Sequence, residues 1–305
     1  MQKNKSNQIL DELVQKWAID YVSLIYEKIK PIAQQRTDSV QPLMKKVLDA
    51  FAAEKVSSQH FLSSTGYGHT DYGREIIDRV FARVLGAEKA AVRLQFVSGT
   101  HAISSALFGI LRPGDRLISA MGSPYQTLHE VIGIRKSGQG SLMDFGINYE
   151  EIPLNNDEQI DLEALKRALE LPARVVFIQR SCGYTWRSSL SIKNIARICE
   201  IIKVKQPNTV CFVDNCYGEF VEDKEPLDVG ADLIAGSLIK NLGGTIVPTG
   251  GYVAGKSQLV EQACCRLTAP GIGSDGGINF DLNRIVLQGL FLSPQMVSES
   301  LIGAD

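Results

Sequence analysis

The sequence predicts an α/β protein with a mainly parallel sheet that helices cover on both faces. Short runs rich in β-branched residues are apolar along their whole length, and helical stretches such as HAISSALFGIL and SIKNIARICEIIKV alternate with them. Uniformly apolar strands separated by helices are typical of parallel sheets that are buried on both faces. The predicted strands cover residues 90–98, 116–120, 174–179, 209–214, 231–237 and 250–255.

The N-terminal part has a different pattern. Residues 8–30 repeat apolar positions at intervals of three and four, and Pro31 follows, which predicts an amphipathic helix that ends there. We divide the 305 residues into an N-terminal helical segment (1–55), a large domain (56–290) and the start of a further helix (291–305). A chain of this length can bury one large core.

The amino-acid composition limits the kinds of partner that the protein can bind. The 32 basic and 34 acidic residues nearly cancel, so no long-range field attracts nucleic acid or an acidic membrane. The first residues, MQKNKSNQ, are polar, and no window reaches about 18 uninterrupted apolar residues. The six cysteines form no CxxC pair and the four histidines show no ligand spacing, which favours buried free thiols over a metal site. We therefore expect a soluble, cytoplasmic protein with a small-molecule partner.

The first candidate site residues follow the first predicted strand. In FVSGTHAISSAL, residues Ser98, Gly99 and Thr100 join a strand to a helix. Free backbone N–H groups and the positive end of the helix dipole make such a junction suited to a phosphate, and glycine permits close approach. Ser-Gly-Thr is also an ordinary helix N-cap, so both interpretations stay open.

Two later strands also end in polar residues. In CFVDNCYGEF, Asp214 ends an apolar strand, where a carboxylate is costly unless it is paired, although it could also cap a helix. In ADLIAGSLIKNLGG, a strand runs into Ser237 and then Lys240. A lysine desolvated in a pocket has a lowered pKa and becomes a nucleophile, whereas most lysines are solvated surface charges.

Together these three strand ends contain the parts needed to hold pyridoxal phosphate. They offer an anion site, a partner for the pyridinium nitrogen and an amine for a Schiff base. Other phosphate motifs do not fit: no GxxxxGK[ST] or strand-linked GxGxxG occurs. The glycine-rich stretch GIGSDGG (271–277) has no lysine for phosphates and is interpreted as a mobile loop.

Longer stretches of the sequence resemble a known family. From about residue 55 onward, the chain resembles the cystathionine β-lyase and methionine γ-lyase-like proteins often labelled aluminium resistance proteins. The matching stretches are STGYGHTDYGRE, VSGTHAI, GDRLISAMGSPYQTL, FVDNCYGEF, GSLIKNLGGTIVPTGGYVAG and GLFLSP. The resemblance implies the aspartate aminotransferase-like fold, called fold type I, whose large domain has a mainly parallel, mixed sheet of the seven-stranded type.

The resemblance also implies roles for the candidate residues. Lys240 would be the Schiff-base lysine and Asp214 the partner of the pyridine nitrogen. Tyr125, from GSPYQTL, would stack on the ring face and take part in catalysis together with Lys240. The phosphate would be held by residues from three parts of the chain: Ser98, Gly99, Thr100 and Ser237 from this subunit, and Tyr67 and Arg74 reaching a cofactor across a dimer interface.

The activity implied is a pyridoxal phosphate-dependent carbon–sulfur lyase that acts on a sulfur-containing amino acid by β- or γ-elimination. An aminotransferase of the same fold and a catalytically idle scaffold are the alternatives. Fold type I enzymes usually continue into a smaller C-terminal domain, whereas this sequence ends at ESLIGAD, so we expect that domain to be missing. We also expect a homodimer or homotetramer.

Overall fold

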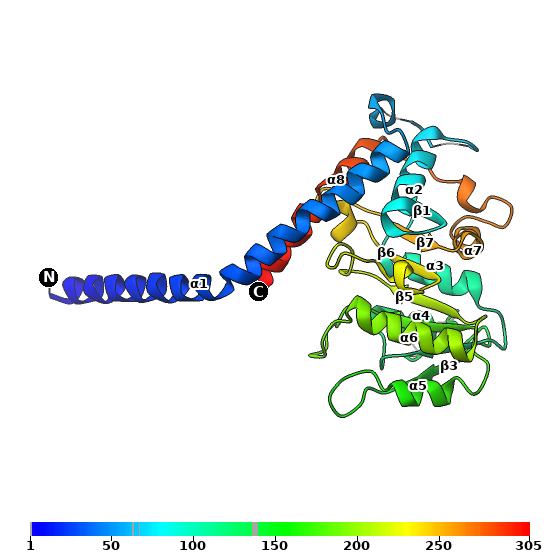
Figure 1. Ribbon diagram of the computed structural model, residues 1–305, viewed down its shortest axis with the longest axis horizontal. Coiled ribbons are helices and arrows are strands. Elements are labelled where there is room, and N and C mark those ends of the chain that lie inside the picture. The colour runs from blue at the N-terminus through cyan, green and yellow to red at the C-terminus, as the bar shows by residue number, and fades with distance from the viewer. Residues whose placement is uncertain (1, 63, 67, 136–139) are drawn as a thin grey trace.

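A mixed sheet of seven strands forms the centre of the protein (Figure 1). The computed structural model describes residues 2–62, 64–66, 68–135 and 140–305. The strand order is β1-β7-β6-β5-β4-β2-β3, with β7 antiparallel to its neighbours and the remaining pairs parallel. The strands are β1 (Lys89–Arg93), β2 (Arg116–Ser119), β3 (Asn148–Glu151), β4 (Val175–Gln179), β5 (Val210–Asp214), β6 (Leu233–Ser237) and β7 (Gly251–Gly255). The predicted fold class, α/β with a mainly parallel sheet, is confirmed.

Helices cover both faces of this sheet. The α-helices are α1 (Gln2–Ala53), α2 (Tyr72–Leu85), α3 (Gly99–Ile110), α4 (Gln126–Ile132), α5 (Leu162–Ala168), α6 (Ile192–Lys205), α7 (Ser257–Leu267) and α8 (Asn283–Ala304). Short 3₁₀ turns are η1 (Ser58–Phe61), η2 (Pro226–Val229), η3 (Asn241–Gly243) and η4 (Gly273–Asp275).

The two faces of the sheet have separate hydrophobic cores. Along β5, Phe212 packs in the core under α3 and α7, whereas its neighbours Cys211 and Val213 pack in the core with α2, α6 and α8. Because adjacent side chains of a strand point to opposite faces, an apolar run in the sequence fills both cores. Each fully buried large apolar side chain contributes roughly 2 kcal/mol of transfer free energy.

Two strand predictions need correction. The predicted strand 90–98 is too long, because β1 ends at Arg93 and a turn leads to Ser98, which caps α3. Strand β3 is absent from the predicted ranges. It lies at the edge of the sheet, its sequence is NYEE, and its side chains are only partly covered. A short polar edge strand lacks the apolar run by which the buried strands were recognised.

The prediction that the N-terminal helix ends at Pro31 is wrong. Helix α1 continues through Pro31 and Pro42 to Ala53. Figure 1 shows it as two arms joined at a bend, which is the expected effect of proline within a helix. A proline removes one backbone hydrogen bond, and packing of the following arm against α8 offsets that loss.

Helix α8 is long and apolar enough to cross a membrane by length and composition alone. In this fold it lies along α1 instead, and Val286, Leu287, Leu290 and Val297 are buried in the core. It therefore has the place of a core helix in a globular protein.

Candidate active site

Three parallel neighbours in the sheet bring their carboxyl ends together. Gln179 ends β4, Asp214 ends β5 and Ser237 ends β6; Gln179 is directly opposite Asp214 in the register. A cavity of about 370 Å³ opens at this edge. It is lined by Tyr125, Asp214, Cys216, Tyr217, Lys240 and residues of the 181–189 loop. Ligands of open α/β sheets bind at such an edge, and the structure brings the predicted residues Asp214, Lys240 and Tyr125 to one cavity.

Asp214 is buried at the floor of this cavity, with 2% of its surface exposed. Its Oδ1 accepts a hydrogen bond of 3.0 Å from the backbone N–H of Cys216. Burial raises the pKa of Asp214, although Cys216 and the Lys240 charge act in the opposite direction. A carboxylate in this position is stabilised by any cation that enters the cavity.

Lys240 follows β6 in the turn that leads into η3. Its Nζ lies 4.1 Å from the centroid of the Tyr217 ring. Burial lowers the pKa of Lys240, but Cys216, Tyr217 and Asp214 outweigh burial, and the pKa is raised. The expectation of a lowered lysine pKa is therefore wrong for this state of the protein, because desolvation is only one of the effects at the site.

The N-terminus of α3 and the end of β6 form a narrow junction. A β carbon at Gly99 would stand 3.1 Å from both Cys216 Sγ and Ser237 Cβ, so only glycine fits without displacement. Within the described part of the chain, the buried hydroxyl of Ser237 has no hydrogen-bond partner. The first turn of α3 also leaves N–H groups without partners in the helix. A lone buried hydroxyl beside a helix N-terminus fits an anionic group such as a phosphate.

Ser98 and Thr100 already have partners in this structure. The Ser98 side chain caps α3 by accepting a hydrogen bond of 3.1 Å from the N–H of His101, which matches the N-cap interpretation. The Thr100 hydroxyl is hydrogen-bonded to Tyr125 Oη and, at 3.0 Å, to the Thr127 hydroxyl. A phosphate at this junction would therefore compete with these side-chain partners for the two hydroxyls.

Gln179 and Tyr217 belong to the site although the sequence did not indicate them. Gln179 Oε1 accepts a hydrogen bond of 2.8 Å from the Tyr125 backbone N–H and so fixes the start of α4. Tyr217 has a positive φ of 66°, which turns its ring toward Lys240. Gln179 could have been predicted only from its place at the end of a third apolar strand. No sequence pattern indicates that a tyrosine has a left-handed backbone conformation.

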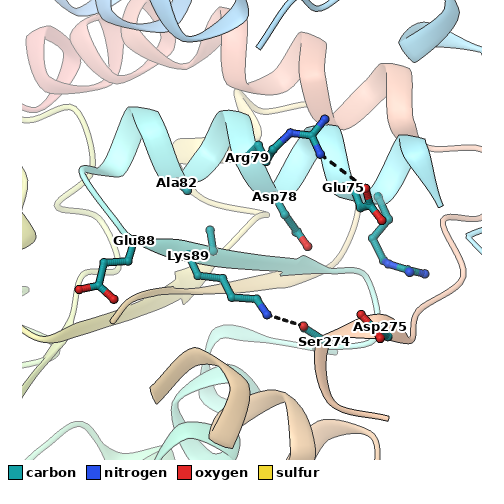
Figure 2. A pocket seen from close by; sticks show the side chains of 10 residues that line it. Glu75, Asp78, Arg79, Ala82, Glu88, Lys89, Ser274 and Asp275 are labelled. Atoms are coloured by element: carbon teal, nitrogen blue, oxygen red, sulfur yellow. Dashed lines mark hydrogen bonds and ion pairs between the residues drawn. The ribbon is translucent and has the colours of Figure 1, made fainter. Parts of the chain in front are cut away.

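Of the two residues expected to act across a dimer interface, only Arg74 is described by the structure, and it does not line this cavity. Tyr67 lies outside the described residues. Arg74 lines a second cavity of about 250 Å³ between α2, β1 and η4, which Figure 2 shows from close by. The Arg74 guanidinium is buried and donates hydrogen bonds of 2.7 and 3.0 Å to the carbonyls of Gly66 and Gly68. Its role toward a neighbouring subunit stays a prediction.

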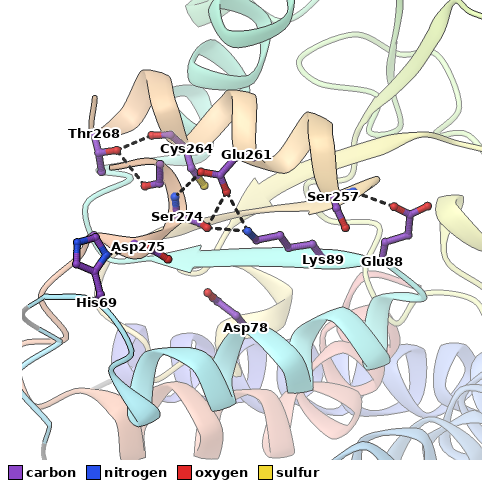
Figure 3. A network of polar contacts seen from close by, with 12 residues as sticks. His69, Asp78, Glu88, Lys89, Ser257, Glu261, Cys264, Thr268, Ser274 and Asp275 are labelled. Atoms are coloured by element: carbon purple, nitrogen blue, oxygen red, sulfur yellow. Dashed lines mark hydrogen bonds and ion pairs between the residues drawn. The ribbon is translucent and has the colours of Figure 1, made fainter. Parts of the chain in front are cut away.

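The glycine-rich stretch 271–277 is tied to this second cavity. Lys89 donates hydrogen bonds to Glu261 (2.9 Å) and Ser274 (2.7 Å), and the Ser274 hydroxyl donates to the same carboxylate (Figure 3). Buried Arg93 also donates to the Ser274 carbonyl. In this structure hydrogen bonds from charged groups of β1 and α7 hold Ser274 in place, and the interpretation of the stretch as a mobile loop stays a prediction.

This structure has the features of the class of fold type I pyridoxal phosphate proteins. These features are the order of the strands, the aspartate and lysine at neighbouring strand ends, and the junction beside them that suits an anion. The chain belongs to the methionine gamma-lyase family, whose model matches residues 19–305. The resemblance seen in the sequence is thus confirmed.

Individual relatives agree with the family. The chain is 44% identical to YnbB of Bacillus subtilis over 297 residues, which is 96% of this chain and 69% of YnbB. It superimposes with a TM-score of 0.87 on a carbon–sulfur lyase involved in aluminum resistance from Clostridium novyi, at 48% identity, covering 90% of this chain and 66% of that one. The fold is shared with the pyridoxal-5'-phosphate dependent protein YhfS of Escherichia coli. That protein is 18% identical and superimposes with a TM-score of 0.66, covering 87% of this chain and 66% of that one.

Proposed function

We propose that this protein is a pyridoxal phosphate-dependent carbon–sulfur lyase acting on a sulfur-containing amino acid of the cystathionine or methionine type, by β- or γ-elimination. One observation carries the proposal. Asp214 and Lys240 line the same cavity, and the unpartnered Ser237 hydroxyl lies beside the N-terminus of α3 next to it. These are the three kinds of group that the cofactor requires.

The residues present fit the cofactor. The amides at the start of α3 and the Ser237 hydroxyl would hold its phosphate, Asp214 would hold its ring nitrogen, and Lys240 would bind it covalently. Tyr125, whose backbone is fixed by Gln179, would flank the ring. When bound, the cofactor supplies an electron sink for the charge that develops at the α carbon of the amino acid.

The chain's own residues account for the proton transfers. In its neutral form, the Lys240 amine is the basic group in the cavity and would remove the α proton from the substrate. A buried carboxylate is most stable opposite a cation, so Asp214 would keep a proton on a ring nitrogen that it faces. In β-elimination a thiol then leaves from the β carbon. In γ-elimination a second proton is removed from the β carbon and the thiol leaves from the γ carbon. In both cases the remaining enamine would take up water and release ammonia, which leaves the α-keto acid.

The test is product formation by the full chain incubated with pyridoxal phosphate. L-Cystathionine and L-methionine are the substrates, and free thiol and α-keto acid are measured. We expect thiol and α-keto acid in equal amounts, and neither from the Lys240→Ala variant. Pyruvate from cystathionine would indicate β-elimination and α-ketobutyrate would indicate γ-elimination, whereas amino-group transfer without thiol release would favour an aminotransferase instead.

A further inference from the structure

Helix α8 contains a buried glycine near its first turns. Glycine within a helix lowers stability relative to alanine, because its backbone has more conformational freedom to lose on folding. Gly289 is nonetheless a buried residue of α8, between the core residues Leu287 and Leu290. A glycine in this place is explained by a contact that a side chain would not permit.

That contact is with η3, the turn that follows Lys240. A β carbon at Gly289 would stand 2.5 Å from the carbonyl oxygen of Gly243, and a β carbon at Gly244 would stand 2.2 Å from the carbonyl oxygen of Gly289. Both clashes are with backbone atoms, which cannot rotate away as the end of a side chain can. The backbones of α8 and η3 therefore touch directly.

Hydrogen bonds extend this contact to Lys240. The Gly243 N–H donates to the carbonyl of Lys240 at 3.2 Å. The Gly243 carbonyl, which faces Gly289, accepts bonds of 3.1 and 3.2 Å from the N–H groups of Ile246 and Val247. A displacement of Gly243 would therefore move the turn that carries Lys240.

The turn is also anchored on another side. Asn241, next to Lys240, donates a hydrogen bond of 2.8 Å from Nδ2 to the carbonyl of Glu219. Glu219 belongs to the segment after β5 in which Asp214 and Tyr217 lie. Lys240 thus has its place between that segment and α8.

A side chain at position 289 would displace η3 more readily than α8. Helix α8 has 22 residues, packs along α1 and buries apolar side chains such as Leu287 and Leu290, whereas η3 has three residues. Moving the helix would disturb many more packed contacts than moving the turn. The Lys240 Nζ would then leave the Tyr217 ring, whose centroid is 4.1 Å away.

We propose that Gly289 is a positioning residue that fixes Lys240 in its cavity through the direct backbone contact of α8 with η3. The inference rests on the proposed function, in which Lys240 binds the cofactor, and adds the group that sets the place of its amine. Because α8 packs along α1, a movement of this helix pair would reach Lys240 through the same contact.

Acetylation of Lys240 in the full chain, before cofactor is added, tests the inference. Acetic anhydride reacts with the neutral amine, and peptide mapping by mass spectrometry gives the rate at Lys240 relative to the exposed Lys193 on α6. We expect Gly289→Ala to raise this relative rate by about tenfold at about pH 8, because the amine loses the neighbours that favour its charged form.

Two variants are matched controls. Gly303→Ala is in the same helix, at a glycine whose β carbon would meet no atom of another described segment within 4 Å. Gly109→Ala introduces a similar clash, 2.5 Å from the carbonyl oxygen of Gln262, but between α3 and α7. Gly303→Ala should behave as wild type. Gly109→Ala should lower the Tm without changing the relative rate at Lys240.

An unchanged or lower relative rate in Gly289→Ala would overturn the inference. An equal rise in Gly109→Ala would overturn it too, since a general loosening of the fold would then explain both results. If Gly289→Ala does not fold, the double variant with Val247→Ala should show the same rise over Val247→Ala alone, because Val247 Cγ2, 2.8 Å from the added β carbon, is the nearest side-chain atom.

A failure of the proposed function would look different. Borohydride treatment would then fix no cofactor on Lys240 in wild-type protein, whatever the acetylation rates. Cofactor fixed on Lys240, together with an unchanged acetylation rate in Gly289→Ala, rejects only the role of Gly289.

Discussion

The ammonium group of Lys240 lies over the face of the Tyr217 ring, 4.1 Å from its centroid. Such a contact stabilises the charged form of a lysine by roughly 0.5–2 kcal/mol. Tyr217 reaches this position because its backbone has a φ of 66°, directly after the strand end that carries Asp214. The lysine is therefore held beside the aspartate in its protonated form.

Replacement of Tyr217 should change the titration of Lys240. We expect Tyr217→Ala to lower the pKa of Lys240, because the ring that stabilises the charged form of the lysine is removed. Covalent uptake of pyridoxal phosphate, followed by absorbance across a pH series, should then reach its half-maximum at lower pH. Tyr217→Phe keeps the ring and is the matched control; equal shifts in the two variants would exclude a role for the ring face.

Asp214→Asn should separate cofactor binding from catalysis. The variant should still bind pyridoxal phosphate, because binding depends mainly on the phosphate site and Lys240. It should lose elimination activity by orders of magnitude, because a neutral amide cannot keep the ring nitrogen protonated. Thiol release and cofactor absorbance are measured on the same samples. Near-normal turnover in an active form would show that Asp214 does not have this role.

Glu219 should make stability depend on pH. It is fully buried, its Oε2 has no partner within the described residues, and its Oε1 accepts a hydrogen bond of 2.6 Å from Tyr252 Oη. Burial raises the pKa of Glu219 to about 8. The folded state thus binds a proton that the unfolded state has released, so stability falls as pH rises from about 4.5 to about 8.

Glu219→Gln should remove that part of the pH dependence. Thermal melts of wild-type and variant protein from acidic to mildly alkaline pH provide the comparison. The wild-type Tm should fall more steeply over this interval, and the difference between the two curves reports Glu219 alone. Parallel curves would show that Glu219 titrates at a normal carboxyl pKa in the folded protein.

The projecting arm of α1 predicts a homodimer. Its side chains Leu13, Trp17, Ile19 and Val22 are more than half exposed and the arm extends away from the sheet in Figure 1. Apolar surface of this extent usually marks an interface, and two-fold pairing is the commonest assembly. Light scattering at micromolar concentration should give at least a dimeric mass.

The double substitution Trp17→Ser and Val22→Ser should shift the measured molecular mass toward that of the monomer. Lys28→Ser on the same arm should leave the mass unchanged. A monomeric wild-type protein would remove the basis for placing Tyr67 and Arg74 in a shared site. A dimer that retains its cofactor after Tyr67→Phe and Arg74→Ala would keep the assembly and discard those two residues.

The sequence predicted the parts of the fold and site that depend on local pattern. Asp214, Ser237 and Lys240 were recognised because each follows an apolar strand, and parallel strands bring their carboxyl ends to one edge. Strand β3 was missed because an edge strand needs no apolar run. Helix α1 continues beyond Pro31 because tertiary packing can outweigh the loss of one backbone hydrogen bond.

Residues recognised only from the structure depend on contacts between distant segments. Gln179 matters because its side chain accepts a hydrogen bond from the backbone of Tyr125, 54 residues earlier in the chain. This contact has no periodicity or motif that one stretch of sequence could reveal. The raised pKa of Lys240 likewise follows from neighbours in space and not from its place in the chain.

The central claim is that Lys240 binds pyridoxal phosphate at the junction of β5, β6 and α3. Borohydride reduction of the full chain after incubation with pyridoxal phosphate, followed by peptide mapping, tests it most directly. The account predicts loss of the cofactor absorbance band and a single modified peptide that contains Lys240. Label on Lys193 or Lys256 instead, or no label above that of a Lys240→Ala control, would contradict it.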